Sequence, residues 1–159
     1  ITIGCAAALV PRKGITTLLQ AISLLRNDGV KVNVVIAGTG EEEIPLKKLT
    51  KQLGITKAVS WLGEVKEMHK FWQQIDIYVQ PSHDESFGMA AIEAAGSGVP
   101  VIASNVGALS EVLADTGTFF PKKDQEKLNN IDEKYFIKWN TNYAFKNNTV
   151  SKEVIGFYG

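Results

Sequence analysis

Two glutamates near the middle of the chain have a spacing that suits ligand binding. Glu85 and Glu93 are eight residues apart, with glycine and small side chains between them. We expect a helix to begin at Phe87, with Glu85 just before it and Glu93 about two turns inside it. A helix start favours an anion, because its first N–H groups are free and its dipole is positive there. Two flanking carboxylates would then suit a ligand with a central phosphate and hydroxyls at both ends, the layout of a nucleotide-sugar.

Three further loops carry residue types that fit such a ligand. Lys13, followed by Gly14, precedes a strong helical pattern and suits a diphosphate, although a solvated loop charge is an equal reading. Gly38 and Gly40 let the backbone turn sharply, but they lack the third glycine of a dinucleotide fingerprint and are weak evidence alone. The apolar stretch ending at Gly63 could hold a flat base or could equally pack in the core.

The acidic pair also carries an expectation about burial. Glu93 lies in the run Ala90–Gly96, which is otherwise apolar, so we expect its carboxylate to be buried. A buried acid needs a hydrogen-bonding partner, and ligand hydroxyls would supply one. His83, two residues before Glu85, is a weaker candidate to line the same pocket.

The elements that must position these loops alternate between strand and helix patterns. Continuous apolar runs, in which apolar and polar residues do not alternate, are typical of strands that are covered on both faces. Strands separated by helices predict a parallel sheet with right-handed crossovers. We therefore expect an α/β fold with a Rossmann-like, doubly wound parallel sheet of about six strands. The expected strands are Ile1–Ala6, Val32–Ala37, Val59–Leu62, Ile75–Val79, Val99–Ala103 and Thr118–Phe120, and the expected helices are Ile15–Arg26, Pro45–Leu53, Met68–Gln74, Phe87–Ala95 and Leu109–Ala114.

Composition narrows the function classes. The formal net charge of zero argues against broad electrostatic binding to nucleic acid. Cys5 is the only cysteine and lies in an apolar run, so we expect a small buried residue. No apolar stretch reaches the roughly 20 residues that a membrane helix needs, and no cluster has metal-ligand spacing. We expect one domain over residues 1–121 and a C-terminal extension over 122–159 that packs on it, with a closing helix near Val150–Tyr158.

Taken in order, these loops resemble the donor-binding half of GT-B retaining glycosyltransferases, and of glycosyltransferase family 4 in particular. The resemblance covers about residues 1–121. It rests on the segments Leu9–Gly14, Gly38–Gly40, Trp61–Gly63, Pro81–Gly88 and Glu93–Ser104. The paired-glutamate motif with its Phe-Gly is fairly specific, and the ordered set of loops is much more so.

The resemblance implies transfer of a hexosyl group, with retention, from a UDP-, GDP- or ADP-sugar to a glycan, lipid or small-molecule acceptor. It implies no cofactor and no metal. By the same resemblance Lys13 neutralises the diphosphate and Glu85 contacts the sugar hydroxyls, as the two catalytic residues. The implied donor-binding residues are Gly14, Gly38, Gly40, Gly63 at the base, Phe87, Gly88 and Met89 at the phosphate or sugar, and Glu93 at the ribose.

Two departures from the family pattern qualify this expectation. Ala8 stands where the family usually has an arginine that joins the lysine on the diphosphate, so donor binding should be weakened. The acceptor-binding N-terminal domain is not in the chain, so we expect it to be supplied in cis or in trans. That domain would also make any peripheral membrane contact, at the cytoplasmic face, and the expected location is cytoplasmic. The alternatives are a non-catalytic binding or assembly module and a sugar-nucleotide epimerase of the same architecture.

Overall fold

The computed structural model describes residues 1–113 and 117–120. Within them, no helix is long and apolar enough to cross a membrane. The expected C-terminal extension over 122–159 lies outside the described residues, so its packing and its closing helix stay predictions.

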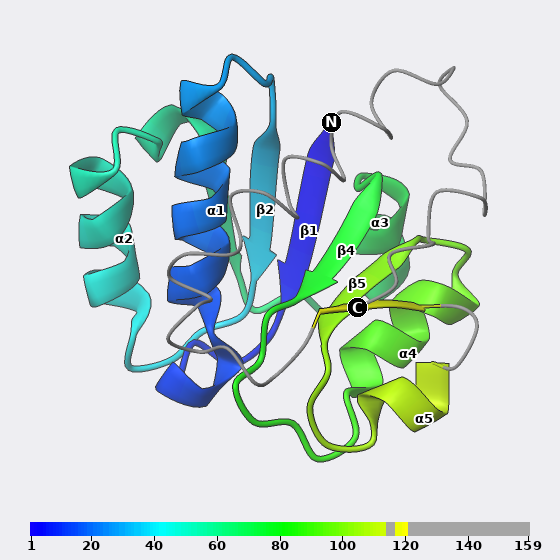
Figure 1. The fold of residues 1–159 in the computed structure, drawn as a ribbon. Helices are drawn as coiled ribbons and strands as arrows, with labels where there is room; N and C mark the ends of the chain where they lie inside the picture. The colour runs from blue at the N-terminus through cyan, green and yellow to red at the C-terminus, as the bar shows by residue number, and fades with distance from the viewer. Residues whose placement is uncertain (114–116, 121–159) are drawn as a thin grey trace.

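A parallel sheet of six strands forms the centre of the molecule (Figure 1). Its strand order is β3-β2-β1-β4-β5-β6, and every neighbouring pair is parallel. This is the order of a doubly wound Rossmann-type sheet, which confirms the predicted fold class. The strands are β1 Thr2–Ala6, β2 Asn33–Ala37, β3 Val59–Gly63, β4 Ile77–Gln80, β5 Val101–Ser104 and β6 Gly117–Phe120.

Helices connect the strands and cover both faces of the sheet. The α-helices are α1 Ile15–Asn27, α2 Glu43–Gln52, α3 Met68–Gln73, α4 Met89–Gly96 and α5 Leu109–Leu113. Two short 3-10 helices, η1 Pro11–Lys13 and η2 Thr56–Ala58, were not expected from the sequence. In Figure 1, α1 and α2 lie in front of the sheet, and α3, α4 and α5 lie behind it or to its right.

Each face of the sheet has its own apolar core, because successive strand residues point to opposite faces. On β4, Ile77 and Val79 pack in the core beneath α1 and α2, whereas Tyr78 packs in the core beneath α3, α4 and α5. The amphipathic stripe of α1 supplies five buried residues to the first core: Ile15, Leu18, Leu19, Ile22 and Leu25. Burial on both faces explains why the strand patterns are continuously apolar.

The start of α4 differs from the expectation. The helix begins at Met89 rather than at Phe87, because Gly88 adopts a left-handed conformation (φ 74°) and serves as its N-cap. Glu85 therefore lies in an irregular loop, and Glu93 lies about one turn inside the helix rather than two.

The strand order reverses between the central strands β1 and β4. Ligands of open α/β sheets bind beyond the carboxyl ends of the strands at such a switch point. In Figure 1 these carboxyl ends point downward, and the loops after β1 and β4 lie along the lower edge.

Candidate functional site

The loops that follow β1 and β4 are fastened to each other by their backbones. The carbonyl oxygen of Arg12 accepts hydrogen bonds from the backbone N–H groups of His83, at 2.8 Å, and Asp84, at 3.2 Å. The His83 ring adds a contact, with Nε2 3.3 Å from Thr17 Oγ1. His83 is half-buried at this seam, by which we mean the contact between the loop after β1 and the loop after β4. Two segments about 70 residues apart in sequence thus form one rigid unit.

Gly14 makes this close approach possible. Its φ of 63° is left-handed, and a Cβ added there would lie 2.0 Å from the carbonyl oxygen of Pro81. A real Cβ never approaches backbone so closely, so a side chain at Gly14 would force the two loops apart. The predicted donor-binding Gly14 thus has a structural task at the seam.

The seam brings Lys13 and Glu85 together in one ion pair. Lys13 Nζ lies 2.5 Å from Glu85 Oε2, and the two side chains are only 12% and 7% exposed. The prediction that both residues belong to one site is consistent with this contact. In the structure, however, each is the other's partner.

Further donors from β4 and its loop surround the Glu85 carboxylate. Glu85 Oε2 accepts hydrogen bonds from Gln80 Nε2 at 3.0 Å and from Ser82 Oγ at 3.2 Å. Gln80 and Ser82 are themselves buried. Ser104 on β5 holds the backbone of this segment, with its hydroxyl donating to the Ser82 carbonyl oxygen at 2.5 Å.

These contacts decide the protonation state of Glu85. Burial by itself would raise the pKa of this carboxyl group. The hydrogen bond and charge of Lys13, with hydrogen bonds from Ser82 and the Gly88 backbone, outweigh burial and lower the pKa below its ordinary value of 4.5. Glu85 is therefore a carboxylate at neutral pH.

The loop after β2 approaches the same edge through its glycines. A Cβ at Gly38, where φ is 130°, would lie 1.9 Å from the carbonyl oxygen of Ala7, and one at Gly40 would lie 2.4 Å from that of Leu9. Gly38 N–H donates to the Gly63 carbonyl oxygen at 2.7 Å, which links this loop to the end of β3. A Cβ at Gly63 would meet no atom within 4 Å, so the space beside this residue is open.

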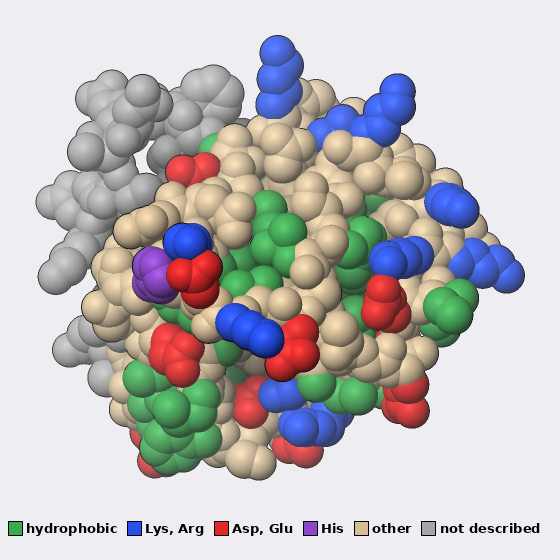
Figure 2. Space-filling model, turned by 180° about the vertical axis from the view of Figure 1, so that it is seen from behind, with side chains coloured by type: hydrophobic (Ala, Val, Ile, Leu, Met, Phe, Trp, Pro, Cys, Tyr) green, Lys and Arg blue, Asp and Glu red, His purple; other side chains and the backbone are tan. Residues whose placement is uncertain are grey.

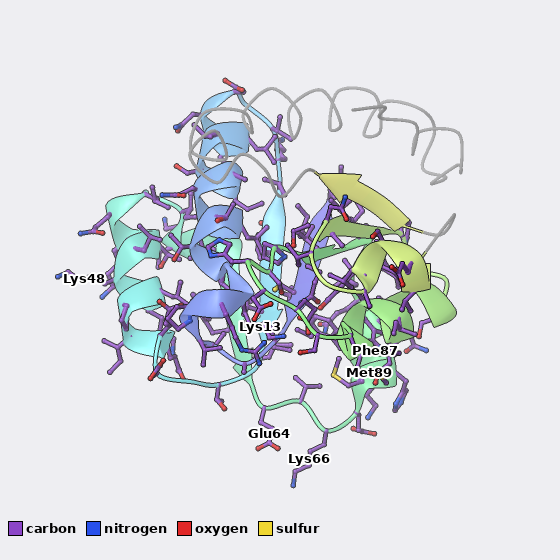
Figure 3. The ribbon with its side chains drawn as sticks, turned by 60° about the horizontal axis from the view of Figure 1, so that its bottom comes forward. Lys13, Lys48, Glu64, Lys66, Phe87 and Met89 are labelled. Atoms are coloured by element: carbon purple, nitrogen blue, oxygen red, sulfur yellow. The ribbon has the colours of Figure 1, made fainter. Side chains whose placement is uncertain are left out.

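The start of α4 borders the site. Phe87 and Met89 expose 53% and 57% of their surface, and no side chain caps the helix. Figure 3 shows Lys13 near the middle of the carboxyl edge, Glu64 and Lys66 on the loop after β3, and Phe87 and Met89 at the start of α4. Seen from behind, hydrophobic side chains gather at the end of the molecule where α4 and α5 lie (Figure 2).

The expected burial of Glu93 is wrong. Its side chain is exposed, because α4 turns Ala91 and Ala94 into the core and Glu93 lies on the opposite side. The neighbouring alanines are too small to cover a carboxylate. Glu93 stays available to a ligand, but it does not need one to compensate burial.

The other sequence candidates have structural positions. Cys5 is fully buried, as expected, and burial raises the pKa of its thiol to about 12, with the charge of Lys13 acting in the opposite direction. Trp61 is half-buried, and Lys47 Nζ lies 5.9 Å from its ring centroid. Among the described residues, no group of three or more His, Cys, Asp and Glu could hold a metal ion.

Gln80 is the site residue that the sequence reasoning missed. It ends the β4 strand after Ile77, Tyr78 and Val79, all of which are buried. A lone amide at the carboxyl end of a buried strand was a usable signal, because a buried polar group needs partners.

Comparison with known proteins shows which family the chain matches. The profile of the family described as "Glycosyl transferases group 1" matches residues 1–151. The Escherichia coli O-antigen biosynthesis glycosyltransferase WclY is 30% identical over 128 residues, which cover 80% of this chain and 35% of that protein.

Two solved structures extend the likeness. The pneumococcal O-GlcNAc transferase GtfA, in complex with UDP and GlcNAc, superposes with a TM-score of 0.81 at 21% identity, covering 97% of this chain and 31% of that one. Anabaena Alr3699/HepE, in complex with UDP-glucose, has a TM-score of 0.68 at 26% identity, covering 82% and 38%. The chain thus spans about a third of the length of these relatives.

Proposed function

Because this chain belongs to the glycosyl transferases group 1, we propose that it is the nucleotide-sugar-binding domain of a retaining, family 4 glycosyltransferase. The donor is a UDP-, GDP- or ADP-sugar, and the transferred group is a hexosyl group. The acceptor, a glycan, lipid or small molecule, binds mainly to a second domain outside this chain. The proposed location is the cytoplasm. Any contact with the cytoplasmic face of a membrane would be made by that second domain.

One observation carries the proposal, namely the Lys13–Glu85 ion pair at the switch point of the sheet. It holds a cation and a carboxylate side by side where α/β sheets bind ligands. A diphosphate needs the cation, and sugar hydroxyls need the carboxylate. The GtfA structure contains UDP and GlcNAc, and the HepE structure contains UDP-glucose. Both ligands support a nucleotide-sugar donor for this chain.

Binding would proceed by exchange of partners. The donor diphosphate takes the Lys13 ammonium from Glu85, and the carboxylate then accepts hydrogen bonds from the sugar hydroxyls. The start of α4, which no side chain caps, contributes the backbone N–H group of Met89 to the phosphates.

The remaining donor contacts follow once the diphosphate lies at Lys13 and the sugar at Glu85. The exposed Glu93 reaches the ribose hydroxyls, and the open space beside Gly63 takes the base. The loops can approach one another closely enough to contact one donor because they have no side chain at Gly14, Gly38 and Gly40.

Catalysis in this scheme is electrostatic. As the glycosidic bond breaks, negative charge grows on the departing diphosphate, and Lys13 with the helix N-terminus stabilises it. The acceptor attacks on the face from which the diphosphate leaves, which retains the anomeric configuration. The scheme requires no metal and no cofactor.

A thermal-shift panel tests the proposal. The chain is melted with UDP, GDP and ADP and with a sugar conjugate of each. A ligand that binds the folded state alone raises the melting temperature. We expect one nucleotide series to raise it, and the sugar conjugate to raise it further. A flat response to all six compounds would contradict the proposed site.

Ala8 favours a second candidate, a non-catalytic module that keeps the fold. Ala8 is exposed near the start of the loop that follows β1, so burial leaves room for an arginine side chain there. Ala8→Arg should tighten UDP binding by about tenfold, the effect of one charge-assisted hydrogen bond. With an acceptor domain supplied, recovery of transfer supports the enzyme, and tighter binding without transfer supports the module.

A further inference from the structure

A buried glutamine links the core of the domain to the carboxylate of the site. Gln80 is 2% exposed at the carboxyl end of β4. Its Nε2 donates to Ser82 Oγ at 2.8 Å and to Glu85 Oε2 at 3.0 Å, and its Oε1 lies 2.5 Å from the Tyr78 hydroxyl. Both ends of the amide are therefore occupied, and its orientation is fixed by its neighbours.

The far end of this chain of contacts is anchored. The Tyr78 hydroxyl also lies 3.0 Å from the carbonyl oxygen of Ala6, the last residue of β1. The Tyr78 ring is fully buried and packs edge-on against Trp72, with 5.4 Å between ring centroids. The chain from Tyr78 through Gln80 to Glu85 therefore begins in rigid core and ends at the site.

The proposed exchange of partners gives Gln80 a task. While Lys13 contacts Glu85, the carboxylate has three side-chain donors. When the lysine turns to a diphosphate, Gln80 and Ser82 are the side-chain donors left on it. A buried carboxylate that lost all three would be strongly destabilised and would move.

We propose that Gln80 is a positioning residue that holds the Glu85 carboxylate in place for the donor sugar after Lys13 has turned to the diphosphate. The inference rests on the proposed function, since it assigns a role within that same site. Gln80 itself touches neither sugar nor phosphate.

The test separates positioning from mere stability by measuring what the sugar adds to binding. The affinities of UDP and UDP-glucose are measured by calorimetry, and their ratio is the contribution of the sugar. If UDP does not bind, GDP with GDP-mannose or ADP with ADP-glucose serves as the pair. A general loss of stability lowers both affinities together and leaves the ratio unchanged.

Gln80→Met keeps the length and the burial of the side chain but removes both polar ends. We expect the ratio to fall by about tenfold, as for one hydrogen bond to a charged group, while UDP binding changes little. Gln80→Glu keeps the shape but replaces the donor by a carboxylate, and it should abolish the contribution of the sugar. Ser104→Ala is the matched control, because Ser104 is buried and bonds the backbone of Gln80 and Ser82 without touching the Glu85 side chain.

The outcomes distinguish the two claims. Wild-type protein that binds none of the three pairs would overturn the proposed function and this inference with it. Wild-type binding with an unchanged ratio in Gln80→Met, or an equal fall in Ser104→Ala, would overturn the role of Gln80 alone.

A measurement on the wild type covers the case in which the Gln80 variants do not fold. We expect a crystal structure with UDP-glucose to retain the contact between Gln80 Nε2 and Glu85 while Lys13 contacts phosphate. A complex in which Glu85 has left Gln80 would overturn the inference.

Discussion

At the scale of single residues, the site is an ion pair between two side chains that are each expected to bind a ligand. Lys13 and Glu85 are almost buried, and burial makes both charges expensive to leave unpaired. Each is therefore the other's counter-ion until a ligand offers a replacement. Two predictions follow from this double role.

The first concerns competition between Glu85 and a diphosphate for Lys13. In Glu85→Gln the lysine has no carboxylate partner, so UDP should bind about tenfold more tightly than to wild type. UDP-glucose should lose its advantage over UDP, because the sugar hydroxyls lose a charged acceptor. Calorimetric titration measures both affinities.

Glu93→Gln is the contrasting variant, because Glu93 is exposed and its proposed place is at the ribose. It should weaken UDP and UDP-glucose equally. Weaker UDP binding in Glu85→Gln would show that Glu85 helps Lys13 to bind the diphosphate and does not compete with it.

The second prediction concerns pH. The folded-state pKa of Glu85 lies below 4.5, so the ionised carboxyl stabilises the fold above that pH, and this stability is lost as the pH falls through the folded pKa. Lys13→Met removes the strongest of the contacts that lower the pKa of Glu85, so this pKa should rise from its wild-type value. The variant should lose about 3 kcal/mol at pH 7, and the loss should shrink toward pH 4, where protonation removes the buried charge. Urea unfolding across this range measures it.

Lys48→Met is the control for that series, because Lys48 is exposed on α2 and lies away from Lys13, the partner of Glu85 (Figure 3). It should change stability by less than about 0.5 kcal/mol at every pH. A loss in Lys13→Met that does not vary with pH would contradict the assignment to Glu85.

At the scale of elements, the site depends on how closely the loops after β1, β2 and β4 approach one another. Backbone hydrogen bonds fasten Arg12 to His83 and Asp84, and Gly38 to Gly63. Glycines occupy the points of closest approach because any Cβ there would overlap a carbonyl oxygen. The loops are thus positioned by rigid strands and by each other, which suits a preformed ligand site.

Gly14→Ala tests this arrangement against a matched glycine. Gly14 and Gly54 have similar left-handed φ angles, 63° and 69°, but an added Cβ would overlap Pro81 at Gly14 and meet nothing within 4 Å at Gly54. Gly54→Ala should cost about 1–2 kcal/mol for the backbone conformation alone. Gly14→Ala adds roughly 1–3 kcal/mol of overlap. Equal costs in urea unfolding would mean that the loops separate freely.

At the scale of the whole molecule, two apolar cores sandwich the sheet, and the core beneath α1 and α2 shields Cys5 completely. Burial raises the pKa of the Cys5 thiol to about 12, so the reactive thiolate is almost absent at neutral pH. Cys5 is therefore a reporter of the opening of the domain.

A thiol reagent at pH 8 should label Cys5 only as fast as the domain opens, and at once in denaturant. A bound nucleotide-sugar should slow the labelling, because ligand stabilises the closed form. Mass spectrometry over time measures the rate. Rapid labelling of the native chain, at a rate unaffected by mild denaturant, would show that the first core is open to solvent.

The sequence by itself determined the class of fold and the loops of the candidate site. Apolar runs such as Val34–Ile36 and the stripe of α1 report burial directly, because the spacing of apolar residues matches the geometry of the element that buries them. Element ends shifted by a residue or two, as at α4, where the left-handed conformation of Gly88 decides the boundary.

Only the tertiary structure decided the states of the acidic residues. Glu93 has apolar sequence neighbours yet is exposed, because the packing of α4 determines which side of the helix meets the core. Glu85 has polar sequence neighbours yet is buried, because Lys13, 72 positions away, and the end of β4 close over it. Local sequence records what a residue is next to along the chain, whereas the burial and charge of a carboxylate depend on which distant elements fold against it.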